Sequence, residues 1–412
     1  MFEMTEVNRK KTKALFLLRS YNDMDHITPI IWKCSQSEIV CYFMFVDSEP
    51  SNDYRIDFIK KSGAIKIHSK TINFYHRHIR EYFPFTHLLR MVDFIVSCTL
   101  GNYLLRKNSI DVVVTEWSGK AGREKAKYIL RAAFINKLRI YSVPHGYNIY
   151  TNLDFSKTVI DLKNKMGHWP DFSSRNAFTS YVVQHESSRI FCEAYGIKKH
   201  KLLVLGSARF CREWVMINDK ISKFAVNNQL GNNSFKIVFF LPQWDYNVDR
   251  KGCFRLIVSL SQIPGLFIRL KGSTREIADL YDDEEREFIS TDNVVFSKDE
   301  SSVYLIKWSD VVVNFASSIG LEAVMQKKLI INPTYLHSNT TIFDDSDVTI
   351  DCESLDSVTE NIMKIKKNHT TIPTSRSYQL FYEKFIEGSD SEENVLKKYV
   401  DLILNKQNAK IM

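Results

Sequence analysis

The sequence predicts an α/β protein in which two Rossmann-like domains face a central cleft. Short apolar runs alternate with longer amphipathic segments from end to end, which is typical of parallel sheets wrapped by helices. An Asn-rich stretch at residues 225–235 interrupts this pattern once and fits an interdomain linker better than a helix or a strand. A second alternating series follows the linker. The length of 412 residues and the apolar content of 44% are sufficient for two separate cores.

The predicted strands form two series, one on each side of the linker. In the first half they cover residues 14–18, 39–46, 64–68, 111–115, 139–143, 181–183 and 202–205. In the second half they cover residues 236–240, 266–270, 293–296, 310–315 and 329–332. The C-terminal segment is expected to form one or two helices that pack back on the first domain. The predicted organisation is therefore an N-terminal domain at 1–224, the linker at 225–235, a C-terminal domain at 236–375 and C-terminal helices at 376–412.

The composition narrows the class of partner. Lys and Arg number 56 against 48 Asp and Glu, and the resulting charge of +8 is spread along the chain. Anionic small molecules or a membrane surface fit this charge, whereas nucleic acid is not expected because no groove-reading motif is present. Seven cysteines without a CxxC pair or metal-ligand spacing indicate free thiols in a reducing cytosol.

Targeting and membrane signals are weak. The first twelve residues are polar, and no apolar run approaches the roughly eighteen residues that span a bilayer, so we expect a cytoplasmic protein. Residues 74–85 interleave aromatic rings with cations, a composition compatible with a lipid-linked acceptor or with peripheral association at the cytoplasmic face of the inner membrane. A covered helix with a charged outer face is the alternative.

The junction at residues 310–323 is the most informative motif. A buried strand runs into a helix start through Ser317, Ser318 and Gly320, and this arrangement offers backbone N–H groups and hydroxyls to a phosphate. Glu322 falls about one turn further on, where a carboxylate can accept hydrogen bonds from the hydroxyls of a ribose. The motif predicts a nucleotide site. The alternative is an N-capped helix of an ordinary α/β domain.

The first half places its candidate residues after predicted strands, where open α/β sheets bind ligands. Glu116 follows three valines, and partial desolvation there would suit a general base. His145 stands on a stiff Pro-His-Gly turn and is a candidate base or phosphate donor. A solvated carboxylate and a loop histidine bound to a carbonyl are the alternatives. The candidate substrate-binding residues of this half are Gly146, Asn148, Ser207 and Arg209.

The second half adds candidates at corresponding positions. Asp245 follows the first strand and is either a carboxylate nucleophile toward an anomeric carbon or a helix-capping residue. Gln243 precedes it as a candidate substrate ligand. Arg269 and Lys271 place two cations where they would neutralise a departing nucleotide phosphate. Acidic triplets at residues 23–25 and 345–347 match a short metal-binding pattern that any acidic loop produces, so we predict neither a metal ion nor a cofactor.

Together, the two halves, the Pro-His-Gly turn and the motif at residues 317–323 resemble GT-B glycosyltransferases of bacterial surface polysaccharide synthesis. The chain looks most similar to the capsule and lipopolysaccharide transferases that move Kdo from CMP-Kdo. The CDP-glycerol type polyol-phosphate transferases are a more distant likeness, because they usually carry a His-Pro motif where this chain has Lys271 and Gly272.

The resemblance implies a nucleotide-sugar donor, a glycan or lipid-linked acceptor and metal-independent transfer. In a retaining mechanism it implies that Asp245 attacks the anomeric carbon while Glu116 or His145 assists the acceptor. In an inverting mechanism Glu116 or His145 is the base, and Asp245 only positions the donor. Two other classes stay open: a non-hydrolysing sugar-nucleotide epimerase, which needs no acceptor, and a noncatalytic scaffold of a polysaccharide assembly complex, which binds no nucleotide.

Overall fold

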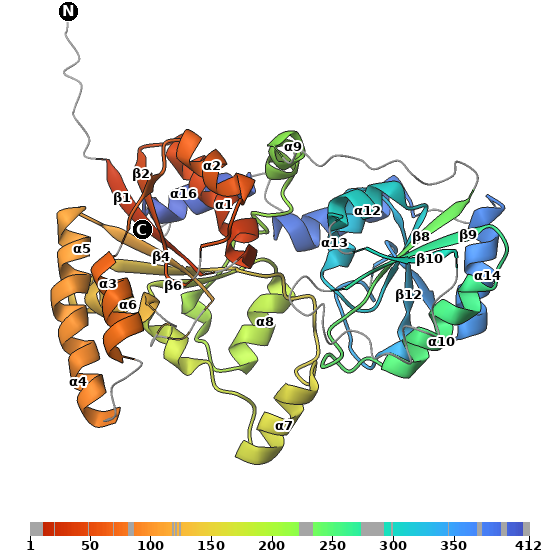
Figure 1. The fold of residues 1–412 in the computed structure, drawn as a ribbon, viewed down its shortest axis with the longest axis horizontal. Helices are drawn as coiled ribbons and strands as arrows, with labels where there is room; N and C mark the ends of the chain where they lie inside the picture. Colours follow the sequence, from red (N-terminus) through yellow and green to blue (C-terminus); the bar gives the residue numbers. More distant parts are fainter. Residues whose placement is uncertain are drawn as a thin grey trace, which may run out of the picture. The chain divides into compact units, whose positions relative to one another are not determined.

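The chain forms two α/β units, each built on its own parallel sheet (Figure 1). Unit 1 comprises Met1–Tyr147, Asp171–Ser222 and Glu387–Met412, and unit 2 comprises Asn148–Pro170 and Lys223–Ile386. The predicted fold class of two Rossmann-like α/β domains is confirmed. The computed structural model describes residues 11–19, 21–47, 49–68, 70–80, 86–117, 119, 122, 125–221, 234–272, 292–297, 300–344, 346–368, 373–388 and 394–406.

Among its described residues, unit 1 contains a seven-stranded sheet in the order β3-β2-β1-β4-β5-β6-β7. The strands are β1 (Thr12–Leu18), β2 (Ile39–Phe45), β3 (Ile65–Lys66), β4 (Val112–Glu116), β5 (Arg139–Val143), β6 (Ser180–Val183) and β7 (Leu202–Val204). The helices are α1 (Tyr21–Ser35), α2 (Tyr54–Lys61), α3 (Lys70–Tyr75), η1 (His76–Arg80), α4 (Thr86–Val96), η2 (Ser97–Gly101), α5 (Asn102–Lys107), α6 (Ala126–Ile135), η3 (Ser173–Ala177), α8 (Glu186–Ala194), η4 (Lys199–Lys201), α9 (Arg212–Ile221) and α16 (Val395–Ile403).

The core of unit 1 follows from its sequence pattern. Strand β4, with three valines in succession, is buried along its whole length, as expected for a central strand covered on both faces. Alternate residues of β1, among them Ala14 and Phe16, face a core that also contains side chains of α1 and α16. Tyr399 of α16 donates a hydrogen bond to the carbonyl of Gly206 at 3.0 Å. The last helix of the chain therefore completes the first unit.

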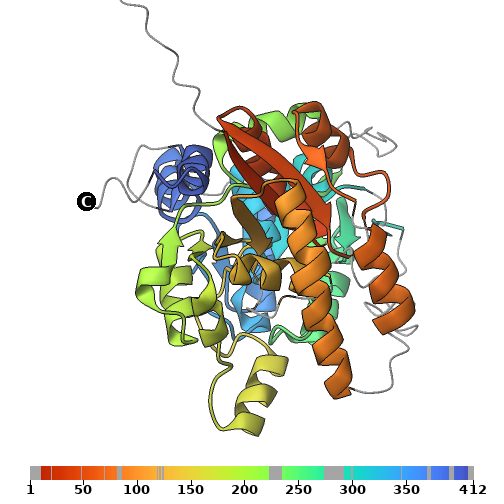
Figure 2. The same ribbon diagram turned by 90° about the vertical axis from the view of Figure 1, so that its left-hand side faces the viewer.

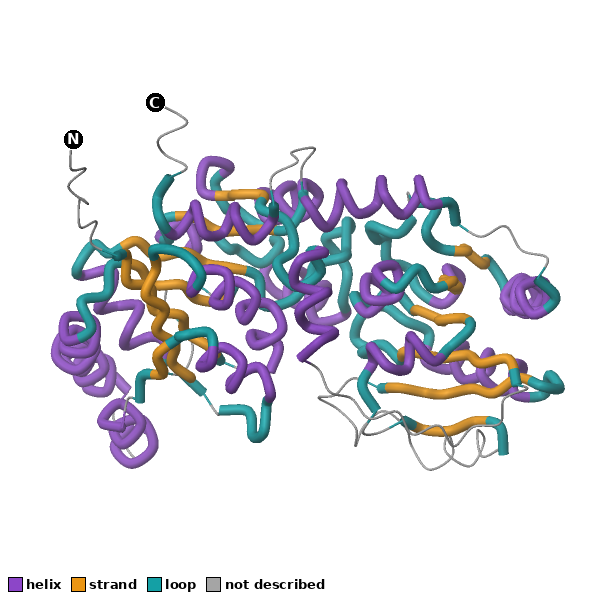
Figure 3. Tube along the Cα trace, turned by 90° about the horizontal axis from the view of Figure 1, so that it is seen from above, coloured by secondary structure: helices purple, strands orange, loops and turns teal. Residues whose placement is uncertain are grey.

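Unit 2 contains a six-stranded sheet in the order β10-β9-β8-β11-β12-β13 among its described residues, and Figure 3 shows the strands of both sheets running between helices. The strands are β8 (Phe235–Phe240), β9 (Leu266–Lys271), β10 (Val294–Phe296), β11 (Val311–Asn314), β12 (Leu329–Pro333) and β13 (Ile350–Cys352). The helices are α7 (Lys157–Met166), α10 (Arg250–Ser261), α12 (Ser302–Trp308), α13 (Ile319–Met325), η5 (Thr334–Leu336), α14 (Leu355–Lys366) and α15 (Ser375–Phe381), and η6 (Tyr382–Glu387) leads back to unit 1.

Three features differ from the sequence-based expectations. Strand β13 has only three residues and was not predicted. The segment 148–170, which includes α7, belongs to unit 2 although it precedes the last two strands of unit 1. The predicted linker lies outside the described residues except for its last two positions.

The expectation that no segment has the length and polarity of a membrane span was wrong. The continuous helical stretch Leu88–Lys107, formed by α4, η2 and α5, has 20 residues and a mean hydropathy of 1.4 over its best window, of which 33% is buried. Arg90, Asp93 and the polar residues between Ser97 and Asn102 divide this stretch into short apolar runs, so the sequence contains no uninterrupted apolar run of that length. Length and composition alone do not show that the helix crosses a bilayer, because core helices have the same properties.

Candidate functional site

Both sheets change winding direction at one point in their strand order. In unit 1 the change lies between β1 and β4, and in unit 2 it lies between β8 and β11. Doubly wound sheets bind ligands beyond the carboxyl ends of the strands at such switch points. The residues that follow these four strands therefore define one candidate site in each unit.

The unit 1 site contains a carboxylate held between a guanidinium and an imidazole. Arg19 follows β1, Glu116 ends β4 and His145 follows the neighbouring strand β5. Nη1 of Arg19 lies 3.3 Å from Oε1 of Glu116, and Nδ1 of His145 lies 3.2 Å from Oε2. The Glu116 side chain is 6% exposed and the His145 side chain 26%. The buried carboxylate thus orients an imidazole that reaches solvent, an arrangement that suits proton transfer.

Trp117 forms a wall beside this pair. Its Nε1 donates a hydrogen bond to the carbonyl of Val182 at 2.7 Å, and its ring stacks on Tyr181 with centroids 5.9 Å apart. The Trp117 ring meets the His145 ring edge to face at 6.1 Å. Because the indole is anchored to β6, on the far side of β5 from β4, it restricts the positions that the imidazole can take.

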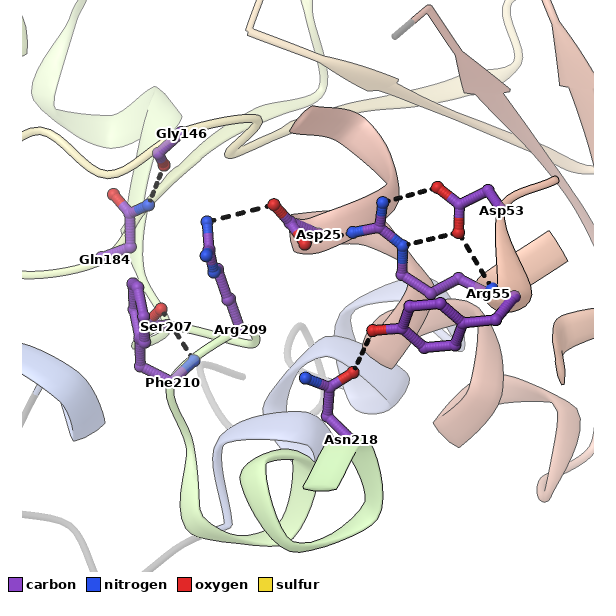
Figure 4. A network of polar contacts seen from close by, with 10 residues as sticks. Asp25, Asp53, Arg55, Gly146, Gln184, Ser207, Arg209, Phe210 and Asn218 are labelled. Carbon is purple, nitrogen blue, oxygen red and sulfur yellow. Dashed lines mark hydrogen bonds and ion pairs between the residues drawn. The ribbon is translucent and has the colours of Figure 1, made fainter. Parts of the chain in front are cut away.

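A second charged cluster of unit 1 joins α1, α2 and the loop after β7 (Figure 4). Arg55 is 1% exposed, and it donates through Nε and Nη2 to the two oxygens of Asp53 at 2.9 and 2.6 Å. Its Nη1 pairs with one oxygen of Asp25, and the other oxygen lies 3.2 Å from Nη1 of Arg209. Asp25 therefore connects a fully buried cation to Arg209, whose side chain is 28% exposed. The network positions the Arg209 guanidinium while leaving part of it accessible to an anionic group.

The other predicted substrate residues of unit 1 have structural partners. The carbonyl of Gly146 accepts a hydrogen bond from Nε2 of Gln184 at 2.6 Å, which ties the loop after β5 to the end of β6 (Figure 4). Ser207 is 1% exposed, and its Oγ accepts a bond from the N–H of Phe210 at 3.4 Å. Ser207 thus closes a turn. Arg19 and Gln184 were not among the residues predicted for the site, although each directly follows a buried strand.

His26 in α1 packs beside these groups and is buried. Burial lowers the pKa of His26 well below its ordinary value, and the charges of Arg209, His145 and Arg55 lower it further. The folded protein therefore keeps His26 neutral at pH values where the unfolded chain protonates it. A depressed histidine pKa makes stability highest above the unfolded pKa and reduces it as the pH falls.

We predict that His26→Gln flattens the pH dependence of stability. As the pH falls below about 6.5, the unfolded wild-type chain binds a proton at His26 that the folded chain does not bind. This difference lowers the free energy of unfolding by up to about 1.4 kcal/mol per pH unit. Urea unfolding at a series of acidic pH values measures this slope, with the exposed His200→Gln as control. Equal slopes for the wild type and His26→Gln would contradict the prediction.

In unit 2, Asp245 holds the start of α7. Its Oδ1 accepts hydrogen bonds from the backbone N–H and the Oγ1 of Thr158, both at 3.1 Å, and its carbonyl accepts from the N–H of Lys157 at 2.8 Å. These contacts satisfy backbone groups in the first turn of a helix. Of the two interpretations that the sequence left open for Asp245, the geometry favours helix capping, although of α7 and not of the helix that follows in the chain.

The unit 2 site is centred on the loop between β11 and α13. Helix α13 begins at Ile319, and the Ser318 side chain makes no capping bond, so its hydroxyl stays exposed. A Cβ atom at Gly320 would stand 2.8 Å from Nδ2 of Asn314 and 2.9 Å from the Phe343 ring, so only glycine fits there. Ala316 in the same loop has a φ of +47°, and its carbonyl accepts a hydrogen bond from the Tyr150 hydroxyl at 3.0 Å.

Other polar residues of the predicted nucleotide site flank the loop between β11 and α13. Ser317 and Glu322 are half-buried on either side of the α13 start. Asn314, which the sequence analysis did not single out, ends β11 and is 1% exposed, and its Oδ1 accepts no hydrogen bond within the described part of the chain. A buried amide oxygen at a switch point is available to a ligand donor.

The two predicted phosphate-binding cations are in different settings. Lys271 is the last residue of β9 and is 5% exposed. Arg269 lies two residues earlier, where Nη1 contacts Oε1 of Glu300 at 2.5 Å and the guanidinium lies 5.1 Å from the Trp308 ring centroid. Lys271 is therefore at the carboxyl edge of the sheet, whereas Arg269 is engaged on the face covered by α12.

The last two predicted residues are in loops of unit 2. Gln243 follows β8, and its carbonyl accepts a hydrogen bond from the N–H of Tyr246 at 3.1 Å. Asn148 belongs to unit 2, whereas Gly146 belongs to unit 1, and Asn148 Oδ1 accepts from the N–H of Tyr150 at 3.2 Å. In the part of the chain that the structure describes, no group of three or more His, Cys, Asp or Glu residues is placed to hold a metal ion.

The sequence matches no protein-family model and no curated protein. Solved structures are similar along nearly the whole chain. UDP-GlcNAc 2-epimerase from Neisseria meningitidis bound to UDP-GlcNAc has a TM-score of 0.59 at 14% identity, covering 96% of this chain and 100% of that chain. UDP-GlcNAc 2-epimerase from Methanocaldococcus jannaschii has a TM-score of 0.57 at 13% identity, covering 97% and 100%. A glycosyltransferase from Rickettsia africae has a TM-score of 0.55 at 13% identity, covering 96% and 99%. At these identities the similarity establishes the fold of two Rossmann-like domains shared by these proteins.

Proposed function

We propose that the protein is an enzyme that acts on a nucleotide-activated sugar and inverts the configuration of one carbon of that sugar. The observation that carries the proposal is the arrangement of Arg19, Glu116 and His145 at the switch point of unit 1. A carboxylate next to a partly exposed imidazole suits removal of a proton from carbon and its return. The fold shared with UDP-GlcNAc 2-epimerases supports the same class of reaction.

The proposed reaction needs groups that move a proton and groups that bind the leaving nucleotide. A hydrogen on a sugar carbon becomes removable when the neighbouring anomeric carbon loses the nucleotide, because the C–H and C–O bonds then break as a C=C bond forms. Return of the proton to the opposite face, with return of the nucleotide, gives the epimer. We assign proton transfer to Glu116 and His145, whose ordinary pKa values differ by about two units. The Arg19 guanidinium lies against the Glu116 carboxylate and holds it in position.

The nucleotide is assigned to unit 2. Ser317, Ser318 and Lys271 offer two hydroxyls and a cation beside the β8–β11 switch point, where they would stabilise the charge of the departing phosphate. Glu322 is assigned to the ribose hydroxyls, and the buried oxygen of Asn314 is suited to a ligand N–H or O–H.

The proposal is tested by incubating the protein with nucleotide sugars in D₂O without an acceptor. UDP-GlcNAc is the first donor of the panel, and NMR together with mass spectrometry reports both the epimer and solvent deuterium in the sugar. We expect both products for at least one donor, and their loss in His145→Gln but not in the exposed control His200→Gln. Failure of every donor to exchange deuterium would refute epimerisation.

Sugar transfer is the second candidate, supported by the fold shared with the Rickettsia africae glycosyltransferase. In that case Glu116 or His145 deprotonates an acceptor hydroxyl, and the donor that the sequence resemblance implies is CMP-Kdo. A polyol-phosphate transferase of the CDP-glycerol type is tested in the same assay with CDP-glycerol as the donor. Nucleotide release that depends on a glycan acceptor, without deuterium exchange, would establish transfer. Calorimetric titrations with CMP, CDP and UDP address the scaffold alternative, which requires that none of them binds.

Asp245→Asn separates the two roles considered for this residue. Asparagine keeps an oxygen that accepts the Thr158 hydrogen bonds, so a helix-capping role predicts a change in turnover within about threefold. A nucleophile in a retaining transfer predicts loss of turnover by at least about a thousandfold. We expect the small effect, measured as kcat with whichever donor the D₂O experiment identifies. Loss of turnover with an unchanged melting temperature would restore Asp245 as a nucleophile.

A further inference from the structure

An apolar helix face remains uncovered on unit 1, away from the site described above. Five large apolar side chains of α4 and α5 are exposed by about half or more: Leu88 by 47%, Met91 by 63%, Phe94 by 51%, Ile95 by 55% and Tyr103 by 62%. We call these residues the α4–α5 face. In Figure 2 the long orange helix that carries them lies in front of the unit, with no helix or strand in front of it.

The opposite side of the helix is fixed to unit 1. Asp93, in the second half of α4, is buried and accepts hydrogen bonds from Tyr75, Lys127 and Tyr128 at 2.8 to 2.9 Å. A Cβ atom at Gly101 would stand 2.6 Å from the carbonyl of Tyr128, so the helix lies directly against α6. The helix therefore cannot leave α6 to cross a bilayer without exposing this charged network to hydrocarbon. It can only lie along a surface.

The charges around the α4–α5 face are almost all positive. No charged residue except the buried Asp93 occurs between Arg90 and Arg106. Both ends of the helix carry exposed cations, Arg90 at one end and Arg106 with Lys107 at the other. Among the described residues from 70 to 107 the cations are Lys70, Arg77, Arg80, Arg90, Arg106 and Lys107, and the one acid is Asp93.

This charge distribution distinguishes between two candidates for covering the α4–α5 face, which are a second copy of the chain and an anionic lipid surface. In an antiparallel pair with a second copy, Arg90 of one helix would face Arg106 and Lys107 of the other. Among the described residues 86–107 the one acid is the buried Asp93, which faces α6 and does not neutralise them. An anionic lipid surface complements both ends at once and accepts the apolar centre. A helix of 20 residues lying in the plane would contact about 30 Å of such a surface.

We propose that the α4–α5 face is a membrane-docking surface that inserts its apolar side chains among the headgroups of an anionic bilayer while Arg90, Arg106 and Lys107 contact lipid phosphates. The partner is the lipid surface itself. Binding therefore depends on both anionic lipid and apolar side chains, because neither term alone gives stable attachment of a peripheral protein. This inference does not depend on the reaction that the protein catalyses.

The test is sedimentation of the full chain with vesicles of phosphatidylcholine alone or mixed with phosphatidylglycerol, at low and high NaCl. We expect binding to the anionic vesicles, weakened by salt. The double variant Phe94→Gln with Ile95→Gln should bind at least roughly tenfold more weakly, because it removes two inserted side chains. Its matched control replaces Met216 and Ile190, exposed apolar residues elsewhere in unit 1, with glutamine and should bind like the wild type.

A separate variant tests the contribution of the cations to vesicle binding. Replacing Arg90, Arg106 and Lys107 with glutamine should weaken binding by roughly fivefold per cation, whereas the same change at the exposed Lys61, Lys199 and Lys220 should have a much smaller effect. Equal binding to neutral and anionic vesicles, or equal binding by the docking variants and their controls, overturns the proposal. Sedimentation velocity distinguishes the other occupant, because a dimer that Phe94→Gln with Ile95→Gln dissociates would show that a second copy covers the face.

Discussion

Glu116→Gln is expected to lower kcat by roughly a thousandfold while the fold and the affinity for nucleotide remain. Glutamine has nearly the same shape as glutamate, so the packing around residue 116 is preserved, but it neither takes a proton from carbon nor orients an imidazolium by charge. The effect is large because the buried Glu116 carboxylate contacts both the Arg19 guanidinium and the His145 imidazole. Single-turnover rates with the donor found in the D₂O experiment measure it.

The control for this variant is Glu186→Gln, the same substitution at an exposed glutamate of unit 1 that pairs with Arg189. It should leave kcat unchanged. Since Glu116 is proposed to act in the chemical step, the variant should change kcat far more than the Kd for nucleotide measured by calorimetry. A Glu116→Gln protein that turns over within a few fold of the wild type would remove Glu116 from the mechanism.

Arg55→Leu is expected to destabilise unit 1 by about 3–5 kcal/mol. The substitution leaves Asp53, whose side chain is 2% exposed, without its buried cation and leaves Asp25 with Arg209 alone. Uncompensated buried charge costs far more than the loss of a surface ion pair. Urea unfolding followed by circular dichroism measures the free energy of unfolding.

Arg189→Leu is the matched control, because Arg189 also pairs with two carboxylates, Glu186 and Glu193, but on the surface of α8. Such a pair contributes about 0–1 kcal/mol. If Arg55→Leu destabilises no more than Arg189→Leu, the Asp53–Arg55–Asp25 network does not stabilise the unit. If Arg55→Leu destabilises the unit more than Arg189→Leu does, a milder variant, Asp25→Asn, tests whether Asp25 positions Arg209. Its readout is the KM for the substrate.

The sequence specified all strands of the described structure except the short β13, and it placed the ends of the central strands to within about a residue or two. Buried strands such as β4 require continuous apolar runs, and the polar residues that follow these runs, Glu116 and His145 among them, necessarily lie at one edge of a parallel sheet. Alternation of strands and helices is a local property of the chain, so it can be read from neighbouring residues. For that reason the fold class and the edge that carries the candidate site were predictable.

Only the tertiary structure decided which side chains meet. The contact of Arg19 with Glu116 depends on β1 lying beside β4, about a hundred residues away in the sequence, and the bond from Thr158 to Asp245 depends on a segment that crosses into unit 2 before unit 1 is complete. Likewise, Arg269 turns to Glu300 on the face covered by α12 and leaves Lys271 at the edge. Strand order and chain crossing are set by the packing of whole elements, and no local pattern of residues records them.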